Sequence, residues 1–233
     1  MTAGVILFGS IGLWSYFNVS YQRSTLWDNV EDHLVRLTET IRLGARYAML
    51  HNAREDIKQI VDNIGNQEKI NNIRIFNKKG EIAFSNSRGE LGRRVGVGDS
   101  RCRICHNQNP PNTELKREKR IRVFRDDSGK RYVGIISPIY NEPSCYKASC
   151  HAHGKEETVL GLLDVVVRLK ATDSKLAAYK QDTLLFAIFV FLVTLSALVF
   201  FVQRFITTPV NGMIRATQKI ARGEQVSRLD VGQ

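Results

Sequence analysis

The sequence predicts an α+β domain, with a long N-terminal helix and an antiparallel sheet, placed between two apolar segments. Residues 3–21 and residues 183–202 contain no charged side chain. Between them, apolar residues first recur with a helical period and then alternate as in strands, in runs separated by turn residues. Helices followed by hairpin-connected strands are typical of the α+β class.

The two apolar segments are long enough to be transmembrane helices. About 20 helical residues span roughly 30 Å, the thickness of the hydrocarbon core of a bilayer. We expect transmembrane helices over residues 1–21 and 183–203. A cleaved signal peptide is the alternative for the first segment, but that segment lacks a basic n-region and a small-x-small cleavage site.

The charges around the second segment bear on its orientation. By the positive-inside rule, the basic residues after it favour a cytoplasmic position for residues 204–233, although three lysines also precede it. The net charge of +11 is spread along the chain and is not clustered with aromatic residues. This distribution indicates a basic surface near anionic lipid and argues against nucleic-acid binding.

The segment after the first span has the spacing of a helix with one apolar stripe. The stripe consists of Val30, Leu34, Leu37, Ile41, Ala45 or Ala48, and Met49. We expect this helix to begin at Asp28, with Glu31 completing a capping box. A second helix is predicted over residues 54–64, ending near Gly65.

Strand-like runs occupy most of the remaining region before the second span. Residues 71–86 are predicted to form a strand, a turn at Gly80 and a second strand, and residues 120–139 repeat this pattern around Asp-Asp-Ser-Gly. Residues 159–169 are a fifth strand, whose many valines and leucines indicate a central position in the sheet. Residues 172–181 are predicted to form a helix that runs directly into the second span.

Two stretches resemble parts of known bacterial receptors. IRIFNKKGEIAFSN, residues 73–86, follows a long and a short helix and resembles the extracytoplasmic sensor domains of the PAS/Cache type. Residues 204–233 resemble the first half of a HAMP domain. The matching positions are Pro209, Val210, Met213, Thr217, Ile220, Gly223 and Glu224.

The resemblance implies a signal-transduction protein that is multi-pass in the bacterial inner membrane. It implies a sensor histidine kinase of a two-component system or, as the second choice, a methyl-accepting chemotaxis receptor. Such receptors are usually homodimers, with the sensor domain (here residues 22–182) in the periplasm. We expect the cytoplasmic output module to lie beyond Gln233 and residues 1–233 to be non-catalytic.

All four cysteines lie in two short segments, both in predicted connections between strands. Cys102, Cys105 and His106 form C-x-x-C-H, the attachment pattern of c-type haem. In that chemistry two thiols bond to the vinyl groups of the macrocycle, and the following histidine becomes a ligand of the iron. The first segment therefore predicts a covalent haem c.

The second segment has a wider spacing. Cys145, Cys150 and His151 form C-x4-C-H, which is known in some multihaem cytochromes, so we predict one or two haems c in all. Attachment requires the oxidising compartment outside the cytoplasmic membrane. Two alternatives stay open: a zinc site of four thiolates, which leaves the trailing histidines without a role, and disulfides or a thiol switch.

A haem with one histidine ligand needs a second axial ligand or an open position. His153, His51 and Met49 are the candidates for that second ligand. His33 is interpreted as a partly exposed helix side chain beside the apolar stripe. Two strong ligands favour redox sensing, whereas an open position favours binding of NO, CO or O2.

These observations predict signal reception by a membrane-bound sensor, with the state of the haem passed through residues 172–203 and HAMP to the output module. A membrane-anchored electron-transfer cytochrome is the first alternative, because the haem motifs fit it equally well. A sensor with a structural zinc or disulfide site, binding small molecules in a PAS/Cache pocket, is the other.

Overall fold

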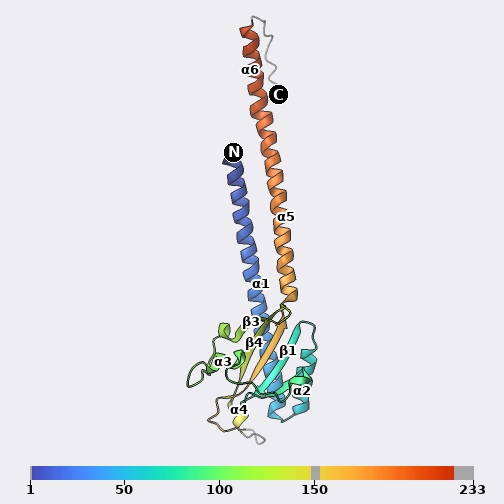
Figure 1. Cartoon of the computed structure of the whole chain (residues 1–233), viewed down its shortest axis with the longest axis vertical. Helices are drawn as coiled ribbons and strands as arrows, with labels where there is room; N and C mark the ends of the chain where they lie inside the picture. Colours follow the sequence, from blue (N-terminus) through green and yellow to red (C-terminus); the bar gives the residue numbers. More distant parts are fainter. Residues whose placement is uncertain (1, 148–152, 223–233) are drawn as a thin grey trace. The chain divides into compact units, whose positions relative to one another are not determined.

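The computed structural model describes residues 2–147 and 153–222. The chain forms two compact units, Ser24–Lys175 and the combination of Met1–Arg23 with Leu176–Gln233. The first unit contains a five-stranded antiparallel sheet and short helices, which confirms the predicted α+β class. Figure 1 shows the order of the elements by colour, from α1 in blue to α6 in red.

The long N-terminal helix begins earlier than the sequence suggested. Helix α1 covers Thr2–Leu50 without interruption, so the predicted start at Asp28 is wrong. The reason is that no glycine or proline occurs between Gly12 and Gly44, and a cap residue does not end a helix that is already running. The predicted second helix is confirmed as α2, Arg54–Gly65.

The predicted apolar stripe of α1 lies in the core of the Ser24–Lys175 unit. Leu34, Ile41, Ala45 and Ala48 are buried in one cluster with residues of α2 and of the sheet. Val30, Leu37 and Met49 pack against that cluster and are partly buried. The stripe therefore holds α1 against the rest of the unit, as an amphipathic helix requires.

The sheet contains the five predicted strands, with the last one at its centre. The strands are β1 Ile70–Asn77, β2 Ile82–Ser85, β3 Ile121–Arg125, β4 Arg131–Tyr140 and β5 Val159–Arg168. Their order is β2-β1-β5-β4-β3, and all neighbours are antiparallel. Gly80 has φ +76°, which a turn between β1 and β2 requires and glycine adopts without strain.

Both faces of the sheet are buried. Side chains two positions apart on a strand share a face, so the α1 side takes Ile73, Ile75, Val133, Ile135, Leu163 and Val165. The opposite face carries Phe76, Ile136, Asp164 and Val166, each at most 3% exposed. The connection between β2 and β3 contacts this second face, and it contains α3, Ser100–His106. In Figure 1, α3 lies to the left of the strands and α2 to the right.

The remaining connections contain short helical turns. They are η1 Arg88–Glu90, η2 Arg117–Arg120 and α4 Pro143–Tyr146. The described parts of the two cysteine segments thus lie in connections, as predicted. Within its connection, the first of these segments forms the helix α3.

Gly161 in β5 allows a close approach of the β1 backbone. A Cβ atom at this position would lie 2.3 Å from the carbonyl oxygen of Phe76 and 3.7 Å from Cδ1 of Ile139. We expect Gly161→Ala to lower the free energy of unfolding by about 1–3 kcal/mol, because β1 must shift to make room. Thermal unfolding of the full chain in detergent measures this loss.

Gly98→Ala is the control for this prediction, since its added Cβ would meet nothing within 4 Å. Equal losses of stability in the two variants would contradict the close approach at Gly161.

The other unit contains most of the apolar helix predicted near the C-terminus, from Leu176 onward. Helix α5, Lys170–Phe201, continues through a π-helical turn, Val202–Thr207, into α6, Thr208–Ala221. Among the described residues, one helix, Lys170–Gln218, is long and apolar enough to cross a membrane, and this supports membrane association by length and composition. The described part of residues 1–21 does not meet the same criterion, so the transmembrane helix over residues 1–21 stays a prediction.

Within this unit, aromatic side chains join the first turns of α1 to α5. The rings of Phe8 and Phe191 have their centroids 6.1 Å apart, edge to face, and those of Trp14 and Phe186 are 6.0 Å apart. Such pairs stabilise beyond the area that they bury. The two apolar segments therefore contact each other.

The HAMP-like segment begins with a local change of helical pitch. Pro209 is the second residue of α6, and a proline inside a helix removes one donor and crowds the preceding turn. The π-helical turn directly before α6 widens the helix at this point. Gly223 and Glu224 lie outside the described residues, so the HAMP resemblance stays a prediction.

Candidate functional site

Helix α3 places the first cysteine motif on one helical face. Cys102, Cys105 and His106 are at positions i, i+3 and i+4, which lie on the same side of a helix. Asp99 is the N-cap, and its carboxylate accepts a hydrogen bond from the backbone N–H of Arg101 at 2.9 Å. The cap explains why this polar connection forms a helix at all.

Arg101 fixes α3 to the second face of the sheet. Its guanidinium donates two hydrogen bonds to Asp99, both 2.7 Å long. The same group lies over the ring of Phe76, 5.4 Å from the ring centroid, and 4.0 Å from a carboxylate oxygen of Asp164. One side chain next to Cys102 therefore joins the motif to β1 and β5.

The two thiols and the imidazole line a common cavity of about 440 Å³, which we call the α3 cavity. Its apolar lining residues are Phe76, Pro110, Pro111, Pro138, Val159 and Leu162. Ligand pockets in proteins commonly have volumes of about 300–1,000 Å³ and mainly apolar walls. His106 itself is exposed on the surface of α3. The cavity thus brings apolar side chains and two sulfur atoms together, an arrangement that suits a partly apolar ligand.

Burial controls the protonation of the two thiols. It is the main reason that the pKa of Cys102 is raised, and the negative charge of Asp99 raises it further. Burial likewise raises the pKa of Cys105, against a smaller opposite effect of Arg120. Both side chains are therefore protonated thiols at neutral pH, and Cys102, Cys105 and Cys145 form no disulfide.

The second cysteine segment is attached to α1. Cys145 is buried on α4, and the preceding Glu142 forms ion pairs with Arg46 at 2.6 Å and Arg42 at 3.7 Å. Arg46 also donates to the hydroxyl of Ser144 at 2.6 Å. Cys150 and His151 lie outside the described residues, so the structure does not test their predicted roles.

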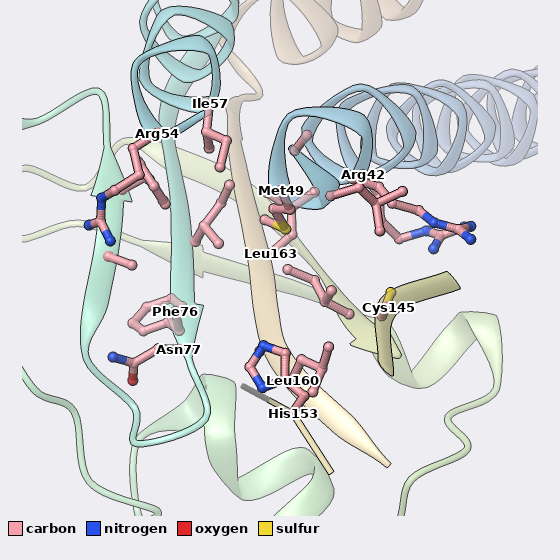
Figure 2. A pocket seen from close by; sticks show the side chains of 18 of the residues that line it. Arg42, Met49, Arg54, Ile57, Phe76, Asn77, Cys145, His153, Leu160 and Leu163 are labelled. Carbon is pink, nitrogen blue, oxygen red and sulfur yellow. The ribbon is translucent and has the colours of Figure 1, made fainter. Parts of the chain in front are cut away.

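A second cavity of about 300 Å³, the α1 cavity, lies between α1, α2 and the sheet. Its lining includes Met49, Cys145 and His153, and Figure 2 shows His153 beside Leu160 and Met49 beside Leu163. Nδ1 of His153 is 3.4 Å from a carboxylate oxygen of Glu157. Two of the three candidate second ligands, Met49 and His153, are thus brought into one cavity with Cys145.

Two further histidines among the described residues, His51 and His33, line neither cavity. The ring of His51 stacks on that of Tyr47, with centroids 4.4 Å apart, and its Nδ1 lies 3.0 Å from the carbonyl oxygen of Tyr47. His51 is exposed and lines neither the α1 cavity nor the α3 cavity. His33 is exposed on α1, as expected.

The thiols of the two segments are separated in the described residues. Cys102 and Cys105 line the α3 cavity, whereas Cys145 lines the α1 cavity. No group of three or more histidine, cysteine or carboxylate side chains within residues 2–147 and 153–222 is arranged to hold a metal ion. Cys150, which the four-thiolate zinc alternative also requires, is outside these ranges.

Sequence reasoning missed the buried charges behind α3. Asp164 is completely buried in β5 and is contacted by Arg74 at 3.3 Å, Arg122 at 2.7 Å and Arg101 at 4.0 Å. Glu90 binds Arg74 in turn, at 2.6 Å. The available signal was the single carboxylate in the apolar run VLGLLDVVVRL, because buried charges are almost always paired.

The cap at Asp99 can be tested by two substitutions. The hydrogen bonds from Arg101 lower the pKa of Asp99 to about 2, so the charged form stabilises α3 above the usual pKa and this stability is lost as the pH falls toward 2. We expect Asp99→Ala to cost about 0.5–2 kcal/mol and Asp99→Asn less, because asparagine still caps. Thermal unfolding at neutral pH measures both, and equal losses would contradict the capping role.

No protein-family model matches the sequence, and a search of curated proteins finds no significant match. The assignment of a function therefore rests on the site itself.

Proposed function

We propose that the chain is the sensor part of a membrane-bound bacterial signalling protein, with a haem c bound covalently at Cys102 and Cys105 and ligated by His106. The observation that supports it best is the position of these three side chains on one face of α3, lining one cavity with apolar walls. Neither a zinc site nor a structural disulfide requires a wide apolar cavity beside the sulfur atoms. The thiols are also free, as attachment requires.

Covalent attachment of the haem requires the protein to position two thiols beside the two vinyl groups. Each thiol adds across one vinyl group: the sulfur bonds to one vinyl carbon and the thiol hydrogen ends on the other, so no oxidant or reductant is consumed. The apolar lining residues of the α3 cavity would cover part of a bound macrocycle. When bound, the haem supplies a one-electron redox couple and, if its second axial position is open, a binding position for a small gas.

The residues around α3 offer a route from the site to the apolar helix. Arg101 adjoins Cys102 and contacts Asp164 in β5. Strand β5 ends at Arg168, and α5 begins two residues later, at Lys170. A movement of α3 would thus change a buried ion pair on the strand that leads into α5. Transmission requires that the two states of the site stabilise different arrangements of these elements.

The wider architecture is part of the same proposal. A long N-terminal helix, a five-stranded antiparallel sheet and an apolar helix followed by α6 support a PAS/Cache-like periplasmic domain joined to HAMP. We propose that the protein is a homodimer in the inner membrane and that its output is a histidine kinase or, as the second choice, a chemotaxis module. We place the second haem of the proposal at Cys145, which shares a cavity with Met49 and His153.

An absorption spectrum tests the presence of the haem. The full chain, produced together with the machinery for c-type haem attachment, is expected to show a Soret band and at least one haem per chain by the pyridine haemochrome method. Cys145→Ser should keep the haem at the first motif. A colourless protein would contradict the proposal.

A second experiment separates a sensor from an electron-transfer cytochrome. Tyr179→Cys at an exposed position of α5, in a chain with Cys145→Ser and Cys150→Ser, allows two copies to be cross-linked by a bis-maleimide, which alkylates thiols without oxidising them. For a sensor, the rate of cross-linking should differ between the oxidised and the reduced protein. A cytochrome that only carries electrons predicts the same rate in both states.

A further inference from the structure

A second, polar concavity adjoins the α3 cavity. This arginine cleft has a volume of about 450 Å³, and its charged lining residues are Arg74, Glu90, Arg93, Arg94, Asp99 and Arg101. Arg101 also lines the α3 cavity and directly precedes Cys102. The arginine cleft and the α3 cavity therefore adjoin each other at the side chain of Arg101.

The charges of the arginine cleft do not balance. Arg74 is paired with Glu90 by hydrogen bonds of 2.7 and 2.6 Å, and Arg101 is paired with Asp99. Among the described residues, no carboxylate pairs with Arg93 or Arg94; the one side-chain bond found runs from Nε of Arg94 to the carbonyl oxygen of Lys79, at 3.0 Å. Two guanidinium charges are thus left over.

Backbone hydrogen bonds hold these two arginines in place. The carbonyl oxygen of Arg93 accepts from the N–H of Ile82 at 3.0 Å, and Arg94 forms a bridge with Glu81. The N–H of Val95 donates to the carbonyl oxygen of Gly80 at 2.9 Å. The segment is therefore fixed against β2 and the β1–β2 turn. The side chains of Arg93 and Arg94 are exposed. An exposed guanidinium group is available to bind a carboxylate, to which it can donate two parallel hydrogen bonds.

We propose that Arg93 and Arg94 bind the two propionate carboxylates of the haem attached at Cys102 and Cys105. This inference rests on the proposed function. A haem carries its two propionates on the edge away from the vinyl groups, so their partners must adjoin the α3 cavity elsewhere than at Cys102 and Cys105. Gly80 in the β1–β2 turn lines that cavity, and Nε of Arg94 donates to the carbonyl oxygen of the neighbouring Lys79 at 3.0 Å. The arginine cleft therefore adjoins the α3 cavity at this turn as well as at Arg101. The cleft beside Arg101 offers two unpaired positive charges for two negative ones. A free oxyanion such as phosphate has the same chemistry and is the competing occupant.

The proposal predicts a change in reduction potential. The reduced haem carries one positive charge less than the oxidised haem, so nearby guanidinium groups favour the reduced form. Replacing both arginines by glutamine should shift the ratio of reduced to oxidised haem at a fixed potential at least tenfold toward oxidised, which is a fall of 59 mV for a one-electron couple. The pH dependence of the potential should also move to higher pH, because propionates without arginine partners have a higher pKa.

The experiment uses the haem-loaded full chain in detergent, with Arg93→Gln/Arg94→Gln compared with Arg88→Gln/Arg125→Gln. The control removes the same charge from exposed positions outside the arginine cleft. The expected result is equal haem content in all proteins and a lowered potential in the cleft variant only. Equal potentials and pH profiles in the two variants would overturn the inference. So would a shift of the wild-type potential by millimolar phosphate, which would identify a free anion as the occupant. Absence of covalent haem in the wild type would instead contradict the proposed function itself.

Discussion

Replacing Cys102 and Cys105 together by serine is expected to remove one covalent haem per chain completely. Serine cannot form the thioether, and both sulfur atoms face the same α3 cavity, so no other described thiol can substitute for them. The fold should be kept, because each side chain is only partly buried. The pyridine haemochrome method measures the haem content. Peroxidase staining after denaturing electrophoresis shows whether that haem is covalently bound.

The matched variant for this prediction is Cys145→Ser. Cys145 lines the other cavity, so its replacement should leave the haem at α3 in place. Circular dichroism confirms that both variants are folded. If the double variant kept its full haem content, attachment at the first motif would be excluded. His106→Ala should keep the covalent bonds and change the position of the Soret band, since it removes a ligand and not an attachment point.

Replacing Asp164 by asparagine is expected to produce the largest loss of stability. The carboxylate is completely buried among three arginines. Arg122 forms an ion pair with it at 2.7 Å. Removing one partner of a buried ion pair leaves an uncompensated charge and costs about 3–5 kcal/mol. For a chain of this size that corresponds to a fall in apparent Tm of roughly 10 °C, measured by thermal unfolding in detergent.

Two comparisons make the Asp164 prediction specific. Asp127→Asn, in the exposed turn between β3 and β4, should change the stability by less than about 0.5 kcal/mol. Adding Arg122→Met to Asp164→Asn should recover part of the loss, because it removes the charge left without its partner. A loss no larger than that of Asp127→Asn would show that the buried ion pairs do not stabilise the domain.

The local features of the fold were predictable from the sequence. The buried stripe of α1, the five strands and the central place of β5 all follow from apolar periodicity and turn residues. The start of α1 was not predictable in the same way. A capping signal at Asp28 has no effect when the residues before it are already helical.

The contacts around the candidate site could not be predicted from the sequence. The C-x-x-C-H spacing identifies the three residues on α3, but nothing local reveals that Arg101 contacts Asp164, which lies 63 positions further along the chain. The arginine cleft likewise depends on the pairing of residues 93–95 with the β1–β2 hairpin. His51 illustrates the converse, because its position near the end of α1 suggested a ligand and the structure places it outside both cavities.

The most direct test of the account is the mass of the peptide that contains Cys102 and Cys105. The full chain is produced with the haem-attachment machinery, digested with a protease and analysed by mass spectrometry. We predict that this peptide carries the added mass of one haem and that its two thiols no longer react with an alkylating reagent. A peptide of unmodified mass with two alkylated thiols would contradict the account.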